Sequence, residues 1–178
     1  MLCRKQEMAK IVKCELDQIQ LLTEVCKATF WPSHKTSAPI DILESYMRNN
    51  FSVSILTEEL NNPKNQYNFL YQEGIVAGYS NIQINTPGSH IKAKNVTKLD
   101  RIYLLEEFFG QNLGADLLKF NIEWSKQHDQ VGIWLYTWVK NYRAISFYEK
   151  NGFKIVGEFD FKITDTHYNP NHIMYLAY

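Results

Sequence analysis

The run Val131–Val139 (VGIWLYTWV) is the stretch that most restricts how this chain can fold. It consists almost entirely of apolar, aromatic and β-branched residues, which is typical of a strand buried on both faces. Such a strand needs neighbouring strands on each side and covering layers above and below. The run therefore predicts a sheet with Val131–Val139 near its centre and helices packed against it.

The remaining elements follow from hydrophobic periodicity and from turn residues. In chain order they are a strand at Ala9–Cys14, helices at Leu16–Phe30, Ile40–Asn49 and Ser52–Leu60 with a loop at Trp31–Pro39, a hairpin of Gln66–Gln72 and Ile75–Ile84, a strand at Lys98–Leu105, a helix at Leu113–Gln127, and strands at Phe153–Phe159 and Ile173–Tyr178. A hairpin followed by a strand–helix–strand unit predicts a mixed, mostly antiparallel sheet of six to seven strands flanked by helices. We expect one α/β domain over residues 1–178.

Composition narrows the classes of function. The 19 basic and 19 acidic residues cancel, which disfavours a nucleic-acid binder that works by neutralising phosphates. No apolar run approaches the length of a membrane span, and the charged N-terminal sequence lacks the apolar core of a signal peptide. Cys3, Cys14 and Cys26 form no C-x-x-C pair, as expected for reduced thiols in the cytoplasm. The histidines show no metal-ligand spacing, so we expect no metal site.

A short helix with an inward-facing tyrosine is predicted after the central strand. Asn141 is a good N-cap, and Ala144, Phe147 and Tyr148 then recur on one face at helical spacing, before Gly152 ends the helix. The ring of Tyr148 could serve packing alone, or the residue could be present for its hydroxyl group. This segment by itself leaves both interpretations open.

The link before the Leu113 helix is rich in residues that tolerate unusual backbone angles. Gly110, Asn112 and Gly114 all fall within it. A turn of this kind at a helix N-terminus exposes backbone N–H groups that can bind an anion. It has neither the Lys-Ser/Thr of a P-loop nor the spacing of a dinucleotide fingerprint. The alternative is a tight strand-to-helix turn that binds nothing.

Together the two segments resemble the signature of the GCN5-related N-acetyltransferase (GNAT) family. That signature reads Arg/Gln-x-x-Gly-x-Gly/Ala at the start of one helix and Asn-x-x-Ala-x-x-Phe-Tyr-x-x-x-Gly-Phe across the next. Its second part is intact here as Asn141, Ala144, Phe147, Tyr148, Gly152 and Phe153. In the first part, Phe109 stands where the family has Arg or Gln, and Asn112 stands where it has Gly.

The resemblance implies that acetyl-CoA is the cofactor and that the two central parallel strands are splayed. The pantetheine arm would lie between Lys98–Leu105 and Val131–Val139 and meet the backbone near Tyr103 and Leu104. The pyrophosphate would lie on the amides of Gly110, Gln111, Asn112, Leu113, Gly114 and Ala115. Asn141 would contact the arm at the end of the second strand, in addition to capping its helix.

The implied reaction is direct attack of an amine on the thioester, and it requires two proton transfers. A phenol with a pKa of about 10 is protonated at neutral pH and can protonate the departing thiolate. Tyr148 is therefore the predicted general acid. The general base is left open among Asp100, Glu106 and Glu107.

A narrower resemblance is to the bacterial PaiA-type polyamine acetyltransferases. It is carried by Asp100–Leu104, by the end of the central strand and by the helical stretch before Pro63. It implies a small amine acceptor and, more finely, a polyamine. The acidic residues of the N-terminal helices could bind such an amine or could be solvated surface; they are Asp41, Glu44, Glu58 and Glu59.

Two other functions compete with this one. The first is acetylation of a protein N-terminus or lysine. The second is a non-catalytic CoA-binding regulatory module, which the departures at Phe109 and Asn112 suggest. Dimers are common among similar proteins, so a homodimer is a further expectation.

Overall fold

The computed structural model describes residues 9–178 and contains a seven-stranded mixed sheet with the order β1-β2-β3-β4-β5-β7-β6. The strands are β1 (Lys10–Lys13), β2 (Asn65–Gln72), β3 (Ile75–Gln83), β4 (Thr97–Leu104), β5 (Gly132–Trp138), β6 (Lys154–Lys162) and β7 (Tyr168–Ala177). Strands β4 and β5 are parallel, and all other neighbours are antiparallel. The predicted α/β class and the mixed, mostly antiparallel sheet are confirmed. Cys3 lies outside the described residues.

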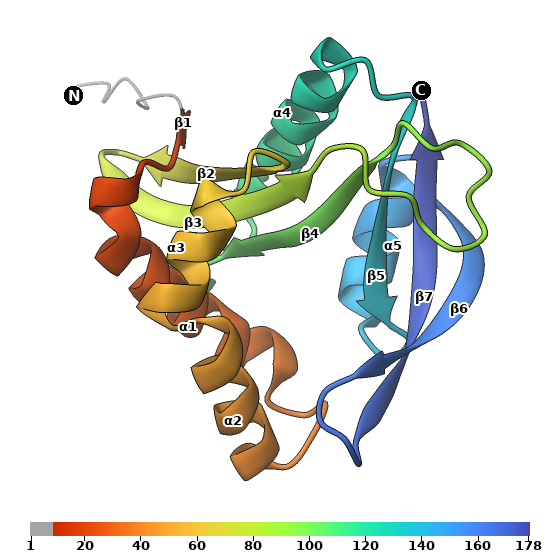
Figure 1. The fold of residues 1–178 in the computed structure, drawn as a ribbon. Coiled ribbons are helices and arrows are strands. Elements are labelled where there is room, and N and C mark those ends of the chain that lie inside the picture. Colours follow the sequence, from red (N-terminus) through yellow and green to blue (C-terminus); the bar gives the residue numbers. More distant parts are fainter. Residues whose placement is uncertain (1–8) are drawn as a thin grey trace.

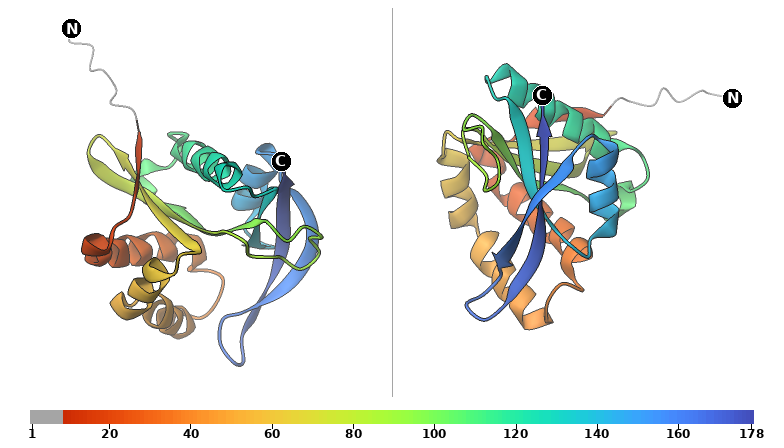
Figure 2. Two further views of the ribbon diagram at one scale, coloured as in Figure 1. Left: turned by 45° about the horizontal axis from the view of Figure 1, so that its top comes forward. Right: turned by 90° about the vertical axis from the view of Figure 1, so that its right-hand side faces the viewer.

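Within residues 9–178, five α-helices cover the two faces of this sheet. They are α1 (Ile19–His34), α2 (Ile40–Asn50), α3 (Val53–Asn61), α4 (Leu113–Gln127) and α5 (Tyr142–Lys150). Figures 1 and 2 show α1, α2 and α3 on one face, with α4 and α5 on the other. A separate buried cluster fills each side, the first around Leu22 and Phe69 and the second around Leu118 and Ile133. Among the described residues, no helix is long and apolar enough to cross a membrane.

The sheet opens between its two parallel strands. β4 and β5 pair only at Thr97 with Ile133 and at Lys98 with Trp134, and they then diverge, as Figure 1 shows. On the other side of β4, the register with β3 shifts at Asp100, which makes this residue the extra one of a β-bulge. Because a bulge bends its strand and increases the local twist, it turns the rest of β4 away from β5.

Helix α1 is longer than the sequence predicted. The prediction that a loop begins at Trp31 is wrong, because the helix continues through Pro32 to His34. A proline removes one helical hydrogen bond, but the N–H of Lys35 still bonds to the carbonyl of Trp31 at 3.0 Å. The ring of Phe30 also stacks on that of His34 with centroids 4.4 Å apart. This packing keeps the last turn helical.

Strand β7 also begins earlier than predicted, at Tyr168 and not at Ile173. The sequence there, Tyr-Asn-Pro-Asn-His, has the composition of a loop. Pro170 lies opposite Asp160 of β6, beyond the last residue of β7 that pairs with β5, which is Asn171. The carbonyl of Pro170 still accepts the N–H of Val139, just past β5, at 3.1 Å, so the proline removes only the donor half of this last pair.

A buried ion pair ties α3 to the sheet. The Arg101 guanidinium on β4 donates two hydrogen bonds to the carboxylate of Glu59 on α3, at 2.6 and 3.1 Å. The hydroxyl of Tyr67 on β2 bonds to both of these groups. The Arg101 side chain is only 10% exposed. The Glu59 side chain is 25% exposed, and Asp100 lies 3.5 Å from the same guanidinium, so Arg101 is the more buried charge and Glu59 is its closer partner.

We expect the Glu59→Gln variant to unfold with a free energy lower by at least about 2 kcal/mol, because it leaves the Arg101 charge buried and only partly compensated. Denaturant melts of the variant and the parent measure this difference. Glu44→Gln is the matched control, since Glu44 pairs with Arg48 at an exposed position, at 3.8 Å, and its loss should change stability by less than about 0.5 kcal/mol. Equal effects of the two substitutions would contradict the structural importance of the Glu59 pair.

Candidate active site

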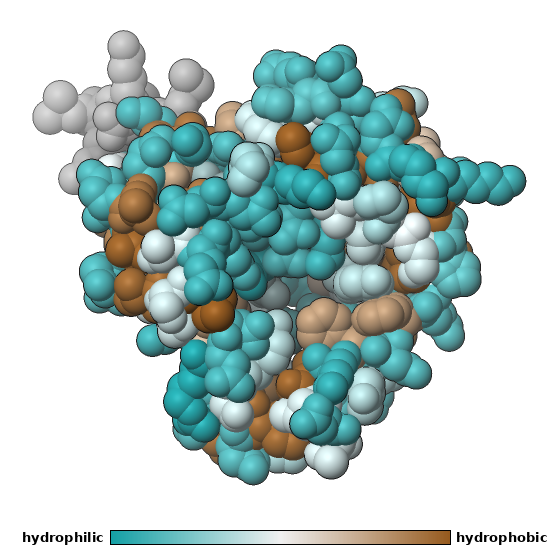
Figure 3. All heavy atoms as spheres, in the orientation of Figure 1, coloured by the Kyte–Doolittle hydropathy of each residue, from teal (hydrophilic) through white to brown (hydrophobic). Residues whose placement is uncertain are grey.

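A cavity of about 860 Å³ lies where β4 and β5 diverge. Its wall on one side comes from β4 and from the end of α1, and on the other from β5, β7 and the start of α5. Figure 3 looks onto a largely hydrophilic face of the molecule, which is hollowed between α2 and the β6–β7 hairpin. The cavity is therefore a consequence of the opened sheet, reached from the surface.

Most of the residues predicted to bind the cofactor line this cavity. They are Tyr103 and Leu104 on β4, Gly110, Asn112, Leu113, Gly114 and Ala115 at the start of α4, and Asn141 before α5. Gln111 does not line it, because its side-chain amide is exposed and donates to the carbonyl of Glu107 at 3.2 Å.

The loop before α4 has the backbone conformation that its sequence suggested. Gly110 has φ +79°, and Asn112, which is the N-cap, has φ +63°. Asn tolerates this left-handed conformation better than other side chains do. The Asn112 side chain does not cap the helix, so the N–H groups of Leu113 and Gly114 at the cavity wall have no side-chain acceptor from the N-cap and lie at the positive end of the helix dipole. This end of the cavity suits a phosphate.

A cation lies beside the same loop. The guanidinium of Arg143, in the first turn of α5, lies 4.0 Å from the centroid of the Phe109 ring, and both residues line the cavity. Phe109 thus supplies no charge of its own but holds one through a cation–π contact. Phe109 is one of the departures from the family signature, and its contact with Arg143 could not be predicted because the two residues lie on different elements.

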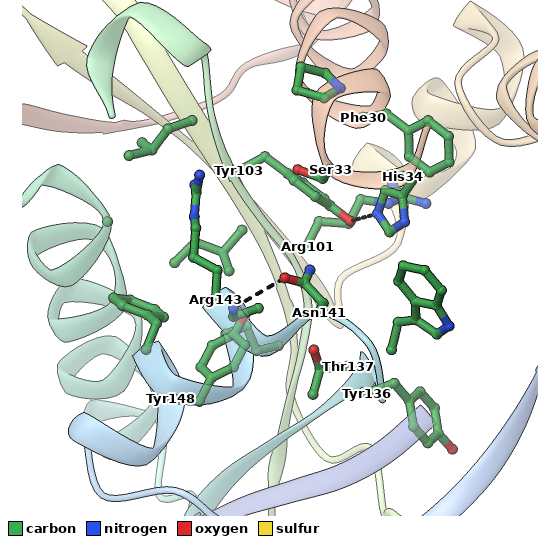
Figure 4. Close-up of a pocket in the computed structure, with 18 of the residues that line it drawn as sticks. Phe30, Ser33, His34, Arg101, Tyr103, Tyr136, Thr137, Asn141, Arg143 and Tyr148 are labelled. Carbon is green, nitrogen blue, oxygen red and sulfur yellow. Dashed lines mark hydrogen bonds between the residues drawn. The ribbon is translucent and has the colours of Figure 1, made fainter. Parts of the chain in front are cut away.

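Asn141 and Tyr148 occupy the α5 side of the cavity (Figure 4). The Asn141 side chain accepts a hydrogen bond from the Ala144 N–H at 3.2 Å, which confirms its prediction as an N-cap. Tyr148 is 8% exposed and packs edge-on against Phe147. Burial raises the pKa of the Tyr148 phenol, so its hydroxyl is protonated throughout the neutral range.

A second phenol, that of Tyr103, faces the cavity from β4. Its hydroxyl lies 2.9 Å from Nε2 of His34 at the end of α1, as the dashed line in Figure 4 shows. Burial lowers the pKa of His34 to about 4, so the imidazole is neutral at pH 7. His34 was not predicted as a site residue, although its spacing from Cys26 and Phe30 continues the apolar stripe of α1.

The carboxylates proposed as bases have different surroundings. Asp100 lines the cavity, but it bonds to Lys98 at 2.6 Å and lies 3.5 Å from Arg101. Burial alone would raise the pKa of Asp100, but these two cations outweigh it and leave the pKa below its usual value. Glu106 and Glu107 lie exposed in a short 3-10 turn and do not line the cavity.

The acidic side chains of the N-terminal helices do not reach the cavity either. Asp41, Glu44 and Glu58 are exposed, and Glu59 is bonded to Arg101. Among residues 9–178, no group of three or more His, Cys, Asp or Glu side chains could hold a metal ion.

These features fit acetyl-CoA. The divergent strands leave one edge of β4 free for an extended chain, the uncapped end of α4 suits a diphosphate, and a protonated phenol lies in the cavity with them. Fold and site together define an acyltransferase that takes its acyl group from a CoA thioester.

The chain belongs to the GNAT family of acetyltransferases, because the model that describes the "Acetyltransferase (GNAT) family" matches residues 30–153. It is 26% identical over 157 residues to an uncharacterized N-acetyltransferase of Lactobacillus delbrueckii subsp. lactis. The alignment covers 88% of this chain and 90% of that protein. The protein is thus an acetyl-CoA-dependent N-acetyltransferase.

Solved structures share the fold. The PaiA N-acetyltransferase from Thermoplasma acidophilum, in complex with coenzyme A, aligns with a TM-score of 0.77 at 23% identity over 97% of this chain and 100% of that one. The ribosomal-protein-S18-alanine N-acetyltransferase from Escherichia coli aligns with a TM-score of 0.69 at 18% identity over 96% and 94% of the two chains. At these identities the likeness establishes the fold alone.

Substitutions of Gly114 test the prediction that the start of α4 binds the pyrophosphate of acetyl-CoA. A Cβ at this position would meet Leu104 and Phe147, both on the cavity wall, at 3.7 and 3.9 Å. Alanine should therefore be accommodated, whereas the larger Gly114→Val side chain should intrude and weaken acetyl-CoA binding by about tenfold or more. Titration calorimetry of both variants measures this. Valine is a better helix former than glycine, so a loss of affinity in Gly114→Val would not come from a weakened helix. Equal affinity of Gly114→Val and the parent would show that the loop is only a turn.

Proposed function

We propose that this N-acetyltransferase acetylates a small primary amine by direct attack on acetyl-CoA. When bound, the cosubstrate supplies a thioester whose acetyl carbon forms the new C–N bond while the sulfur leaves. The observation that carries the proposal is one continuous cavity with the α4 amides at one end, Tyr148 in its wall and free space in front of α1 and α2.

The proposed cofactor contacts follow from this layout. The backbone of Tyr103 and Leu104 would pair with the pantetheine arm, and Asn141 would meet it where β5 ends. The pyrophosphate would be held by the amides of residues 110–115, including the backbone of Gln111. Arg143 would supply the positive charge that Phe109 lacks, because it already lies against that ring.

Tyr148 is the proposed general acid. Its pKa is raised by burial, so the phenol keeps its proton until a stronger base is formed beside it. A departing thiolate is such a base, and it is a better leaving group when protonated. The phenol oxygen needs only to lie within hydrogen-bond reach of the sulfur.

Replacement of Tyr148 by Phe should therefore lower kcat by about ten- to a thousand-fold and leave acetyl-CoA affinity almost unchanged, because the ring packing is retained. Steady-state kinetics and calorimetry together test this. The matched control is Tyr142→Phe on the same helix, where the tyrosine is 75% exposed and its hydroxyl should be dispensable. Full activity of Tyr148→Phe would remove Tyr148 from the acid role.

The finer prediction, a polyamine acceptor, rests on the narrower resemblance. The charge of the cavity weighs against it: Asp100 is the one carboxylate among the described lining residues, and Lys98 and Arg101 both neutralise it. The wall beside α1 and α2 is instead aromatic, with Phe30, Tyr46 and Phe51. A polycation would lose its hydration there without gaining a free carboxylate.

We expect phenethylamine to be acetylated with a kcat/KM at least about tenfold above that of spermidine, since its apolar body suits the aromatic wall. Release of CoA thiol with each amine, at one acetyl-CoA concentration, measures the ratio. Preference for spermidine would contradict the argument from charge and restore the polyamine assignment. Turnover of neither amine, with rapid turnover of an alanine-terminated or lysine-bearing peptide, would favour the protein acceptor.

The regulatory-module alternative has less support, because the Tyr148 helix is complete and the cavity is open. Tight acetyl-CoA binding without transfer to any amine or peptide would favour it. The cytoplasm stays the predicted compartment, on the grounds of the cysteine pattern. A homodimer also stays a prediction, and light scattering of the purified protein would test it.

A further inference from the structure

The proposed mechanism names a proton donor but no acceptor for the proton that the amine loses. Each carboxylate considered for that role is exposed away from the cavity or held by cations. The Tyr103–His34 pair is the remaining polar group of the right kind. Tyr103 and His34 both line the cavity, and the Tyr103 hydroxyl lies 2.9 Å from Nε2 of His34.

The surroundings of His34 fix how the pair can work. Its ring stacks on Phe30 and meets Tyr103 edge-on, with centroids 4.4 and 5.9 Å apart, so both contacts hold its plane. Because the imidazole is neutral at pH 7, one nitrogen is free to accept a hydrogen bond. With the ring proton on Nδ1, Nε2 accepts the Tyr103 hydroxyl proton. The lone pairs of the Tyr103 oxygen are then left to accept an N–H from the cavity.

We propose that Tyr103 and His34 act as a relay that receives the proton of the attacking amine. The inference rests on the proposed function and adds two residues to it. Tyr103 is the catalytic residue, because its oxygen touches the amine, and His34 takes the proton that Tyr103 passes on.

The proton balance closes within the site. As the amine nitrogen bonds to the acetyl carbon, one N–H bond breaks and its proton passes to the Tyr103 oxygen, while the Tyr103 proton passes to Nε2 of His34. The C–S bond breaks, the sulfur leaves with the electron pair, and Tyr148 protonates it. Because burial lowers the pKa of His34 to about 4, the imidazolium holds this proton only briefly and gives it up to solvent or product. The released proton balances the one that Tyr148 has given, and its uptake by Tyr148 restores both residues.

Three variants test the relay with the best amine of the acceptor panel. Tyr103→Phe keeps the ring but removes the oxygen, and His34→Gln keeps an acceptor for the Tyr103 hydroxyl but cannot take up its proton. Each should lower kcat by about a hundredfold with little change in acetyl-CoA affinity. The double variant should be no slower than either single one, because the two residues act as one unit.

The controls separate a relay from a packing role. His128→Gln, at an exposed histidine at the end of α4, should retain parental kinetics. Parental kcat in His34→Gln would overturn the relay and leave His34 as a positioning residue at most. Additive losses in the double variant would also overturn it. Failure of the parent protein to acetylate any amine while it binds acetyl-CoA would overturn the proposed function itself, so the two failures are distinguishable.

Discussion

The end of the β4–β5 pairing after only two residue pairs is the constraint on which the rest of the site depends. Hydrogen-bonding groups on the facing edge of β4 have no strand beside them after Lys98, and buried backbone groups need partners. The bulge at Asp100 turns the strand away, and the Asp100 carboxylate reaches the side chains on both sides of it, Lys98 and Arg101. The charges at this point thus hold the bent strand in place, and the cavity follows from the bend.

This explains why carboxylates that looked like bases in the sequence are poorly suited to that work. Asp100 and Glu59 are each bonded to a cation, and their charges are used to fasten β4 and α3. Both oxygens of each carboxylate already face a cation, so neither is free to accept an N–H from the cavity. The cavity wall beside α1 and α2 is formed by Phe30, Tyr46 and Phe51, which carry no charge. An acceptor amine with several positive charges would find no free carboxylate there.

Much of the fold could be predicted because its signals are local. The Asn141 cap, the Tyr148 face and the positive φ of Asn112 are all encoded within a few residues. The contacts that could not be predicted join segments far apart in the chain: Arg143 on Phe109, Arg101 on Glu59, and His34 on Tyr103. The last also required α1 to continue through Pro32, which tertiary packing of Phe30 and His34 supports against the local preference of proline.

A neutral proton acceptor has a physical advantage in this reaction. An alkylamine, with a pKa of about 10.4, is mostly protonated in water and unreactive in that form. A free carboxylate beside it would favour the ammonium ion further and reduce the fraction of nucleophile. The neutral Tyr103–His34 pair does not favour the ammonium ion in this way, yet it can accept a proton once the nitrogen has begun to bond to carbon and its N–H has become acidic. In a cavity whose carboxylate is already balanced by cations, the proposed donor and acceptor are therefore both uncharged groups at the start of the reaction.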